Sequence, residues 1–115
     1  MAKRLRFHFP LYYIKDNILY GADYHEAREE LVRRWSILCE EGFNSYKTNL
    51  FVHGFEYDEE LFVIYCDNEI YTEFAKIFVD VTSRYHYQLS QDCYIYEVDD
   101  VYVKVYIGEG GYESR

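Results

Sequence analysis

The amino-acid sequence predicts a single α+β domain, residues 1–115, in which two helices cover one face of an antiparallel sheet. Three observations support this fold class. The 115 residues have the length of one domain, and half of them are hydrophobic, so the chain can bury a core. Two segments have the apolar spacing of amphipathic helices. The segments around them show the alternation or the short apolar runs that are typical of strands.

The N-terminal part of the chain predicts a strand followed by a hairpin. Pro10 ends the strand or confines it to a sheet edge, because proline has no backbone N–H to donate. Residues 12–20 carry apolar runs on both sides of a polar turn at 15–17, which indicates a hairpin. In the first strand, Leu5, Phe7 and Phe9 form an apolar face. They alternate with Arg4, Arg6 and His8, which form a face that we expect to be exposed to solvent.

A first helix is predicted over residues 24–41. Asp23 can cap its N-terminus, with Glu26 three residues later as in a capping box. Gly42 is suited to the C-terminal cap. The apolar stripe of this helix consists of Tyr24, Ala27, Leu31, Trp35 and Leu38.

The middle of the chain predicts two strands and a second helix. Residues 47–57 are rich in β-formers, and Asp58-Glu59-Glu60 looks like a polar tip between strands. The apolar run 61–66 is typical of a central strand covered on both faces. Asp67 or Asn68 should cap the second helix, which should end near residue 84. Its buried stripe consists of Ile70, Phe74, Ile77, Phe78, Val81 and Tyr85.

The last part of the chain predicts a hairpin and a flexible tail. Segments 93–98 and 101–107 flank Asp99-Asp100, which suits a two-residue turn. Residues 108–115 look like a frayed tail. The order of elements contains βαββαβ and therefore resembles a ferredoxin-like sandwich, with an added N-terminal hairpin and an extra C-terminal strand. The residues expected in the core are Leu31, Trp35, Leu38, Ile64, Phe74, Phe78 and Val103.

The charge of the chain favours basic partners. Its formal net charge is -9. Residues 1–47 carry eight basic and seven acidic residues, whereas residues 48–115 carry four basic and fourteen acidic residues. Direct binding to nucleic acid is disfavoured, because that affinity comes from Lys and Arg on phosphates, and no RNP1-like run is present. A basic protein surface, including one that normally holds nucleic acid, is the expected partner.

The predicted topology brings six carboxylates to one end of the sheet. The loop after the first helix, the start of the second helix and the last hairpin turn should lie there together. Acids that follow a helix oppose its dipole, so the two that follow the first helix have no local structural role and favour a function in binding. The six residues are Glu40, Glu41, Asp67, Glu69, Asp99 and Asp100.

Tyrosine is the second unusual feature of the composition, with fifteen residues. Tyrosine suits interfaces because it joins a large apolar ring to a polar tip. Tyr102 and Tyr106 should lie opposite the valines of the last strand, together with Tyr94 or Tyr96 across the hairpin. We expect this tyrosine face to contact a partner or a second copy of the chain.

No motif of catalysis or cofactor binding is present, so no cofactor or resident metal is predicted. His25 beside Asp23 could ligate a metal, and His53 could pair with Cys66 if the two share a face. The other cysteines, Cys39 and Cys93, are also expected to be small buried hydrophobes rather than disulfide partners. No apolar run is long enough for a membrane span, and no signal peptide is seen, which indicates a cytoplasmic protein.

In general character the chain resembles the small acidic inhibitors that viruses and mobile elements use against host nucleases, such as anti-CRISPR and anti-restriction proteins. The resemblance implies a non-enzymatic domain that mimics nucleic acid and occupies the basic cleft of a defence nuclease. Two alternatives remain at this point: a small nucleotide- or metal-dependent enzyme, and a homodimeric assembly module.

Overall fold

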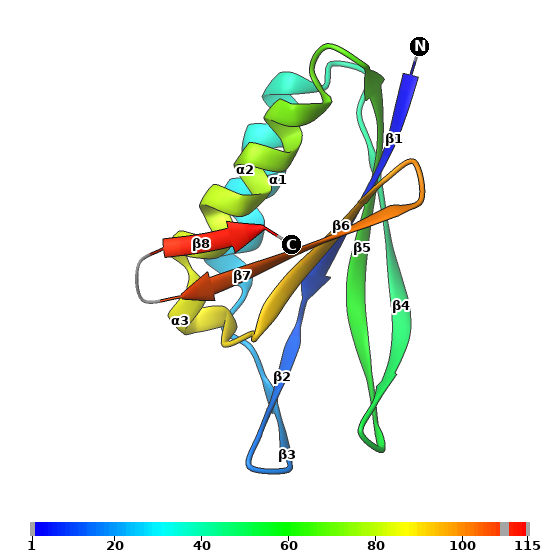
Figure 1. The fold of residues 1–115 in the computed structure, drawn as a ribbon. Helices are drawn as coiled ribbons and strands as arrows, with labels where there is room; N and C mark the ends of the chain where they lie inside the picture. The colour runs from blue at the N-terminus through cyan, green and yellow to red at the C-terminus, as the bar shows by residue number, and fades with distance from the viewer. Residues whose placement is uncertain (1, 109–110, 115) are drawn as a thin grey trace.

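The computed structural model describes residues 2–108 and 111–114. A six-stranded antiparallel sheet has the order β4-β5-β1-β6-β7-β8, and β2 and β3 form a separate hairpin (Figure 1). The strands are β1 (Ala2–Pro10), β2 (Tyr12–Lys15), β3 (Ile18–Gly21), β4 (Asn44–Val52), β5 (Phe55–Asp67), β6 (Cys93–Val98), β7 (Val101–Gly108) and β8 (Gly111–Ser114). The helices are α1 (His25–Leu38), α2 (Tyr71–Arg84) and the single turn α3 (His86–Leu89).

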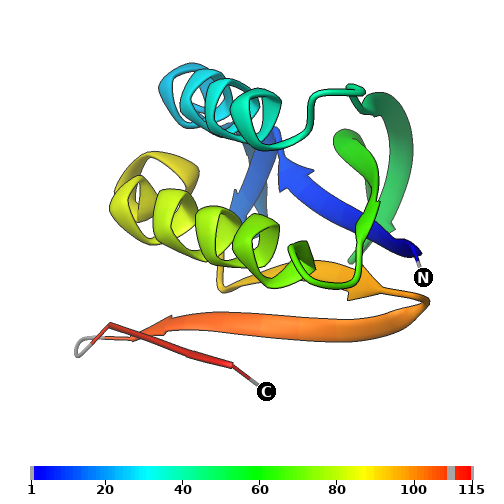
Figure 2. The ribbon, with the colours of Figure 1, turned by 90° about the horizontal axis from the view of Figure 1, so that it is seen from above.

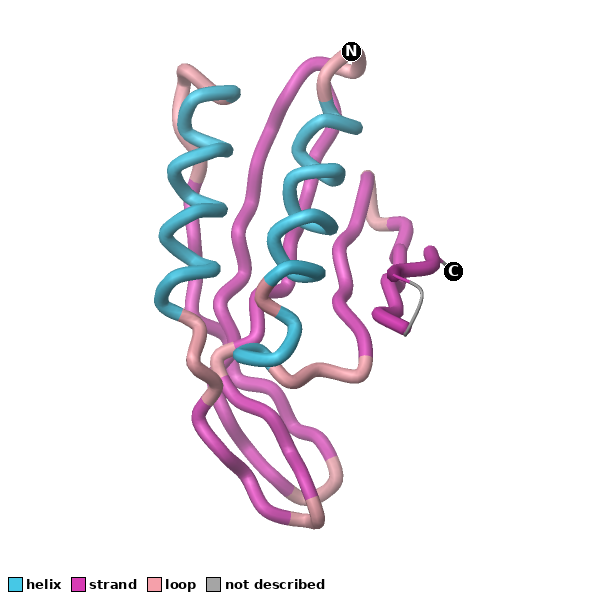
Figure 3. Tube along the Cα trace, turned by 90° about the vertical axis from the view of Figure 1, so that its left-hand side faces the viewer, coloured by secondary structure: helices cyan, strands magenta, loops and turns pink. Residues whose placement is uncertain are grey.

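Both long helices pack on the same face of the sheet, as the sequence predicts (Figure 2 and Figure 3). The ring of Phe7 on the central strand β1 contacts both of them. Its centroid lies 4.6 Å from that of Trp35 on α1 and 4.9 Å from that of Phe78 on α2. The indole N–H of Trp35 donates to the carbonyl of Phe74, 3.1 Å away, so its one polar atom is satisfied inside the core.

Five of the seven expected core residues are fully buried: Leu31, Trp35, Ile64, Phe74 and Phe78. Leu38 and Val103 are only half-buried and pack at the margin of the core. Leu38 is the last residue of α1, where the helix leaves the sheet. Val103 lines the cavity between β7 and α2 instead of packing directly on the helix.

The helices begin later than predicted. Tyr24 rather than Asp23 precedes α1, and it makes no side-chain capping bond. The backbone N–H of Asp23 instead bonds to the carbonyl of Gln88, 3.2 Å away, which ties the start of α1 to α3. A turn over residues 68–70 delays the start of α2, which ends at the predicted residue 84. Helix α1 ends at Leu38, so residues 39–43 form a loop.

The hairpin between β4 and β5 turns at His53-Gly54, and the prediction of a tip at Asp58-Glu59-Glu60 is wrong. His53 and Gly54 have φ values of 49° and 83°, the left-handed pair that two-residue hairpin turns require. The three acids lie inside β5 instead. Glu59 and Glu60 remain there because each meets a basic side chain, His8 and Arg28 respectively.

Two of the predicted turns are present, whereas the prediction of a frayed C-terminal tail is wrong for the residues that the structure describes. Turns at Asp16-Asn17 and Asp99-Asp100 lie where the sequence places them, with positive φ at all four residues. In the expected tail, residues 111–114 form β8 against β7, and residues 109, 110 and 115 lie outside the described part.

Among the described residues, no helix is long and apolar enough to cross a membrane.

Candidate functional site

Three chain segments meet at the end of the sheet where β1 begins. Ala2 pairs with Asp67 at the end of β5, and the N–H of Asp99 in the β6–β7 turn donates to the carbonyl of Arg4, 2.9 Å away. The loop after α1 reaches the same end. Glu40, Glu41 and Asp67 line one hollow of about 360 Å³ there, together with Cys66. The predicted meeting of these segments is therefore present.

The β6–β7 turn does not add its charges to this end, and here the expectation of one surface of six acids is wrong. Asp99 accepts the backbone N–H of Arg4 at 2.9 Å and lies 3.2 Å from the ammonium of Lys3. The bond from the Arg4 N–H, followed by that from Lys3, lowers the pKa of the exposed Asp99 carboxyl. Asp100 forms an ion pair with the guanidinium of Arg4. The basic start of β1 thus neutralises both aspartates.

Four exposed carboxylates at this end have no basic partner among the described residues. They come from the α1–β4 loop and from the β5–α2 connection. No ion pair or hydrogen bond joins their carboxylates to a cation within residues 2–108 and 111–114, and no group of three or more potential ligands suited to a metal is found there. We call these residues the acidic end: Glu40, Glu41, Asp67 and Glu69.

The four predicted tyrosines do not share one face. In the β6–β7 register, Tyr94 pairs with Val105 and Tyr96 with Val103, so both point toward the helices. Tyr94 is buried, which raises the pKa of its hydroxyl, and its oxygen lies 3.0 Å from Nδ1 of His86. The prediction that these two tyrosines accompany the exposed ones is wrong.

The opposite, helix-free face of the sheet carries the exposed tyrosines. Tyr102 is 61% exposed and Tyr106 is half-buried, and both alternate with the valines of β7 as predicted. The pairing registers add Tyr65 and Tyr46 to the same face, and both are exposed. Tyr65 alternates with the buried Ile64 and Cys66 in β5, a pattern visible in the sequence. Tyr46 has no such signal, because its neighbours Ser45 and Lys47 in β4 are exposed as well.

An ion network in the middle of the helix-free face was also not predicted. His8 lies between two carboxylates, with Nδ1 2.7 Å from Glu59 and Nε2 2.6 Å from Glu97. Arg6 adds a contact of 3.4 Å to Glu97, whose side chain is only 3% exposed. Burial alone would lower the pKa of His8, but the hydrogen bonds and charges of Glu59 and Glu97 outweigh it and raise that pKa. The ring of Tyr102 stacks on the imidazole.

This network favours a structural role for His8 over a catalytic one. Both ring nitrogens are engaged by carboxylates, so neither is positioned to exchange a proton with a substrate. The sequence placed His8 on the polar face of β1 correctly. Its partners come from residues 59 and 97, and only the sheet register brings them together.

The proposed pair of His53 and Cys66 is excluded by the length of β5. His53 precedes this strand and Cys66 is next to its last residue. Thirteen residues at about 3.3 Å each place the two ends roughly 40 Å apart. Burial also raises the pKa of the Cys66 thiol to about 11, which keeps it protonated at neutral pH. His25 is exposed and its ring lies beside that of Tyr24, without a group of metal ligands in the described residues.

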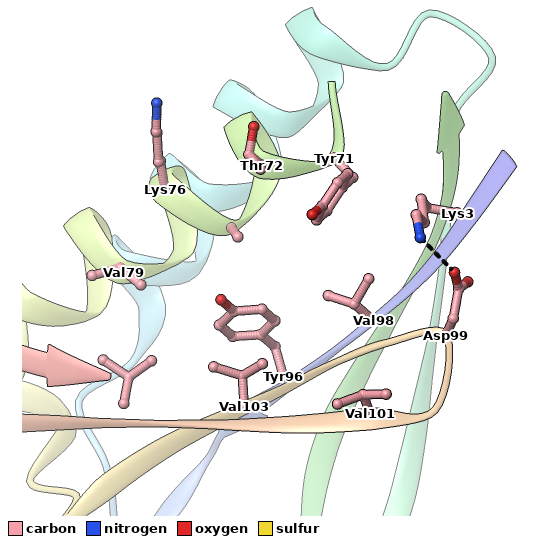
Figure 4. A pocket seen from close by; sticks show the side chains of 12 residues that line it. Lys3, Tyr71, Thr72, Lys76, Val79, Tyr96, Val98, Asp99, Val101 and Val103 are labelled. Carbon is pink, nitrogen blue, oxygen red and sulfur yellow. Dashed lines mark ion pairs between the residues drawn. The ribbon is translucent and has the colours of Figure 1, made fainter. Parts of the chain in front are cut away.

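A large cavity lies between α2 and the β6–β7 hairpin (Figure 4). Its volume is about 650 Å³, and five of its twelve lining residues are valines. Comparison of the chain with protein-family models, with curated proteins and with solved structures gave no match.

Proposed function

We propose that this chain is a non-catalytic domain that binds a basic protein surface through its acidic end. The observation that supports it best is that four exposed carboxylates without a basic partner in the described residues gather at one end of the sheet, three of them around one hollow. Glu30, Glu60, Asp80 and Glu97 each contact an arginine. The four exposed carboxylates of the acidic end have no such partner in the described residues, so their charge is available to another molecule.

The position of Glu40 and Glu41 supports the proposal further. They follow the C-terminus of α1, where the helix carbonyls already carry partial negative charge. Carboxylates at this position are not stabilised by the helix dipole, and they also repel Asp67 across the shared hollow. A basic partner would relieve both costs on binding.

The finer form of the proposal is that the partner surface is the nucleic-acid-binding cleft of a nuclease, which the chain blocks as a mimic. The net charge of -9 supports it, because clefts that hold phosphates attract such a charge from a distance. We also infer a ferredoxin-like sandwich as the scaffold. The neighbouring order β4-β5-β1-β6, with α1 and α2 as the two connecting helices, supports that topology.

Two variants with the same net charge test the proposal. The first removes the acidic end by Glu40→Gln, Glu41→Gln, Asp67→Asn and Glu69→Gln. The matched control removes four exposed acids elsewhere by Asp16→Asn, Glu26→Gln, Glu29→Gln and Asp92→Asn. Each variant is used as bait in lysate of the native host at low and at high salt, and captured basic proteins are identified and their association rates measured.

The wild type and the control variant should capture the same basic partner at low salt and release it at high salt. The acidic-end variant should associate about tenfold or more slowly, because charge complementarity acts mainly on the association rate. If the captured protein is a nuclease, added wild-type protein should also displace its DNA. Equal loss in both variants would show that only net charge matters, and unchanged capture by the acidic-end variant would refute the proposal.

A second candidate function, self-association, is favoured by the helix-free face. Tyr46, Tyr65 and Tyr102 are exposed there on three different strands, and exposed aromatic surface usually marks an interface. Sedimentation of the wild type and of the double variant Tyr65→Ala, Tyr102→Ala tests it.

A further inference from the structure

The cavity between α2 and the β6–β7 hairpin has the shape and chemistry of a ligand site. Val101 and Val103 of β7 face α2 across the gap, with Val79 on the helix side (Figure 4). Ala75 of α2 also lines the cavity. Val101 is 65% exposed, which is unusual for a valine on the helix-covered face of a sheet. The volume of about 650 Å³ lies within the range of about 300–1,000 Å³ that is common for small-molecule pockets.

One mouth of the cavity is polar and carries a cation. The ammonium of Lys3 lies there, 3.2 Å from the carboxylate of Asp99 and 5.5 Å from the centre of the Tyr71 ring. Thr72 and Lys76 of α2 stand on the rim above it (Figure 4).

The charge around the cavity is opposite to that of the chain. Two lysines and one aspartate line it, although acidic residues outnumber Lys and Arg by 21 to 12 in the whole sequence. Asp99 forms an ion pair with Lys3 but accepts only one of the three N–H donors of that ammonium, so the others can bind a ligand oxygen. The two lysines and one aspartate leave the lining with one net positive charge, although Lys76 also lies 3.4 Å from the exposed Glu73, so this mouth suits an anion better than a cation.

We propose that this cavity binds a small amphipathic anion, a carboxylate with an aliphatic or aromatic body. The carboxylate lies at the mouth beside Lys3, and the apolar body lies along the valines of β6 and β7 and against Ala75 and Val79. Burial of the uncovered valine surface provides the affinity, and the ammonium orients the ligand. No residue of the acidic end lines this cavity, so the two proposals can fail independently.

The test uses decanoate as the probe, below the concentration at which it forms micelles, with decanol and decyltrimethylammonium as comparison ligands of the same chain length. Binding is followed by calorimetry and by methyl and amide NMR shifts. Decanoate should shift the signals of Ala75, Val79 and Val103. It should bind about tenfold more tightly than decanol, which lacks the charge that Lys3 recognises.

Three variants locate the site. Val103→Trp fills the cavity and should abolish binding of decanoate, and Val101→Phe is a second filling variant at an exposed position. Lys3→Gln should weaken decanoate about tenfold and leave decanol unchanged. Lys104→Gln is the matched control, because it removes one exposed ammonium from the helix-free side of β7. It should bind both ligands like the wild type.

Any of three results would overturn the proposal. The first is the absence of decanoate binding at millimolar concentration. The second is tight binding that persists in a folded cavity-filling variant, with melting temperature near that of the wild type. The third is equal binding of decanoate, decanol and decyltrimethylammonium, which would remove the role of Lys3.

Discussion

The two faces of strand β1 are one residue apart in sequence and are stabilised by different forces. Leu5, Phe7 and Phe9 point toward the helices and are completely buried among apolar side chains. Arg6 and His8 point the other way and are held by carboxylates. The apolar face should respond mainly to changes of volume. The charged face should respond to pH and to the loss of single charges, so the comparison can be tested by substitution on each side.

The largest effect is expected on the apolar face, at Phe7. Its ring contacts Trp35, Phe78 and Tyr96 at centroid distances of 4.6, 4.9 and 5.5 Å. Phe7→Ala should lower the free energy of unfolding by about 3–5 kcal/mol, because it removes burial and leaves a cavity between both helices and the sheet. Urea denaturation measures this difference. A loss smaller than that of Glu97→Gln would contradict the comparison.

An intermediate effect is expected at Glu97 on the charged face. Its nearly buried carboxylate contacts both Arg6 and His8. Glu97→Gln keeps the shape but removes the charge, and it should cost about 1.5–3 kcal/mol of unfolding free energy. Asp100→Asn is the control, because it removes a carboxylate from an exposed pair and should cost less than about 1 kcal/mol. Equal losses in the two variants would show that burial of the charge does not matter here.

A pH-dependent effect is expected at His8. Its pKa is raised in the folded state by Glu59 and Glu97. Its stabilising contribution is therefore complete below the unfolded pKa of about 6.5 and is lost as the pH rises through the higher folded pKa. Across that window the unfolding free energy of the wild type should fall by at most about 1.4 kcal/mol per pH unit for this proton.

His8→Gln isolates this contribution from the other histidines. The difference in unfolding free energy between wild type and variant should shrink as the pH rises from 6 to about 9. A difference that stays constant over this range would mean that the imidazolium contributes nothing.

The smallest effect on stability is expected at the exposed tyrosines. Tyr102→Ala and Tyr65→Ala should each change the unfolding free energy by about 0.5 kcal/mol or less, although the stacking of Tyr102 on His8 makes its change the larger. If the helix-free face is an interface, the double variant should sediment as a monomer where the wild type associates. A wild type that is monomeric at high concentration would refute self-association.

The helices and the layer arrangement could be predicted because their signals are local. The stripe that includes Leu31 and Trp35 requires only helical spacing. The tip between β4 and β5 could not be placed by composition, since Asp58-Glu59-Glu60 looks more polar than His53-Gly54. The acids remain inside the strand because His8 and Arg28 lie nearby, and these contacts join residues far apart in sequence.

Only part of the candidate site could be predicted, because the order of elements can be read from the sequence but the contacts between distant strands cannot. The meeting of Glu40, Glu41 and Asp67 follows from the order of the elements. The neutralisation of Asp99 depends on the place of β1 beside the last hairpin, which requires the sheet order.

The error at the tyrosines was avoidable. A two-residue turn at Asp99-Asp100 pairs Val98 with Val101, and counting back from that pair places Tyr96 opposite Val103. The turn signal therefore already contained the register, and with it the separation of the tyrosines onto two faces.

Strand β4 has one further consequence, for the behaviour of the protein at high concentration. It forms an edge of the sheet, and among the described residues no strand pairs with its outer side. Its nine residues carry a single charge, at Lys47, and no proline, so little along the strand opposes pairing with another molecule. Mutual repulsion between copies of charge -9 should oppose contact between such edges. The osmotic second virial coefficient should therefore fall as salt is added, so that the salt which releases a basic partner also promotes contact between copies.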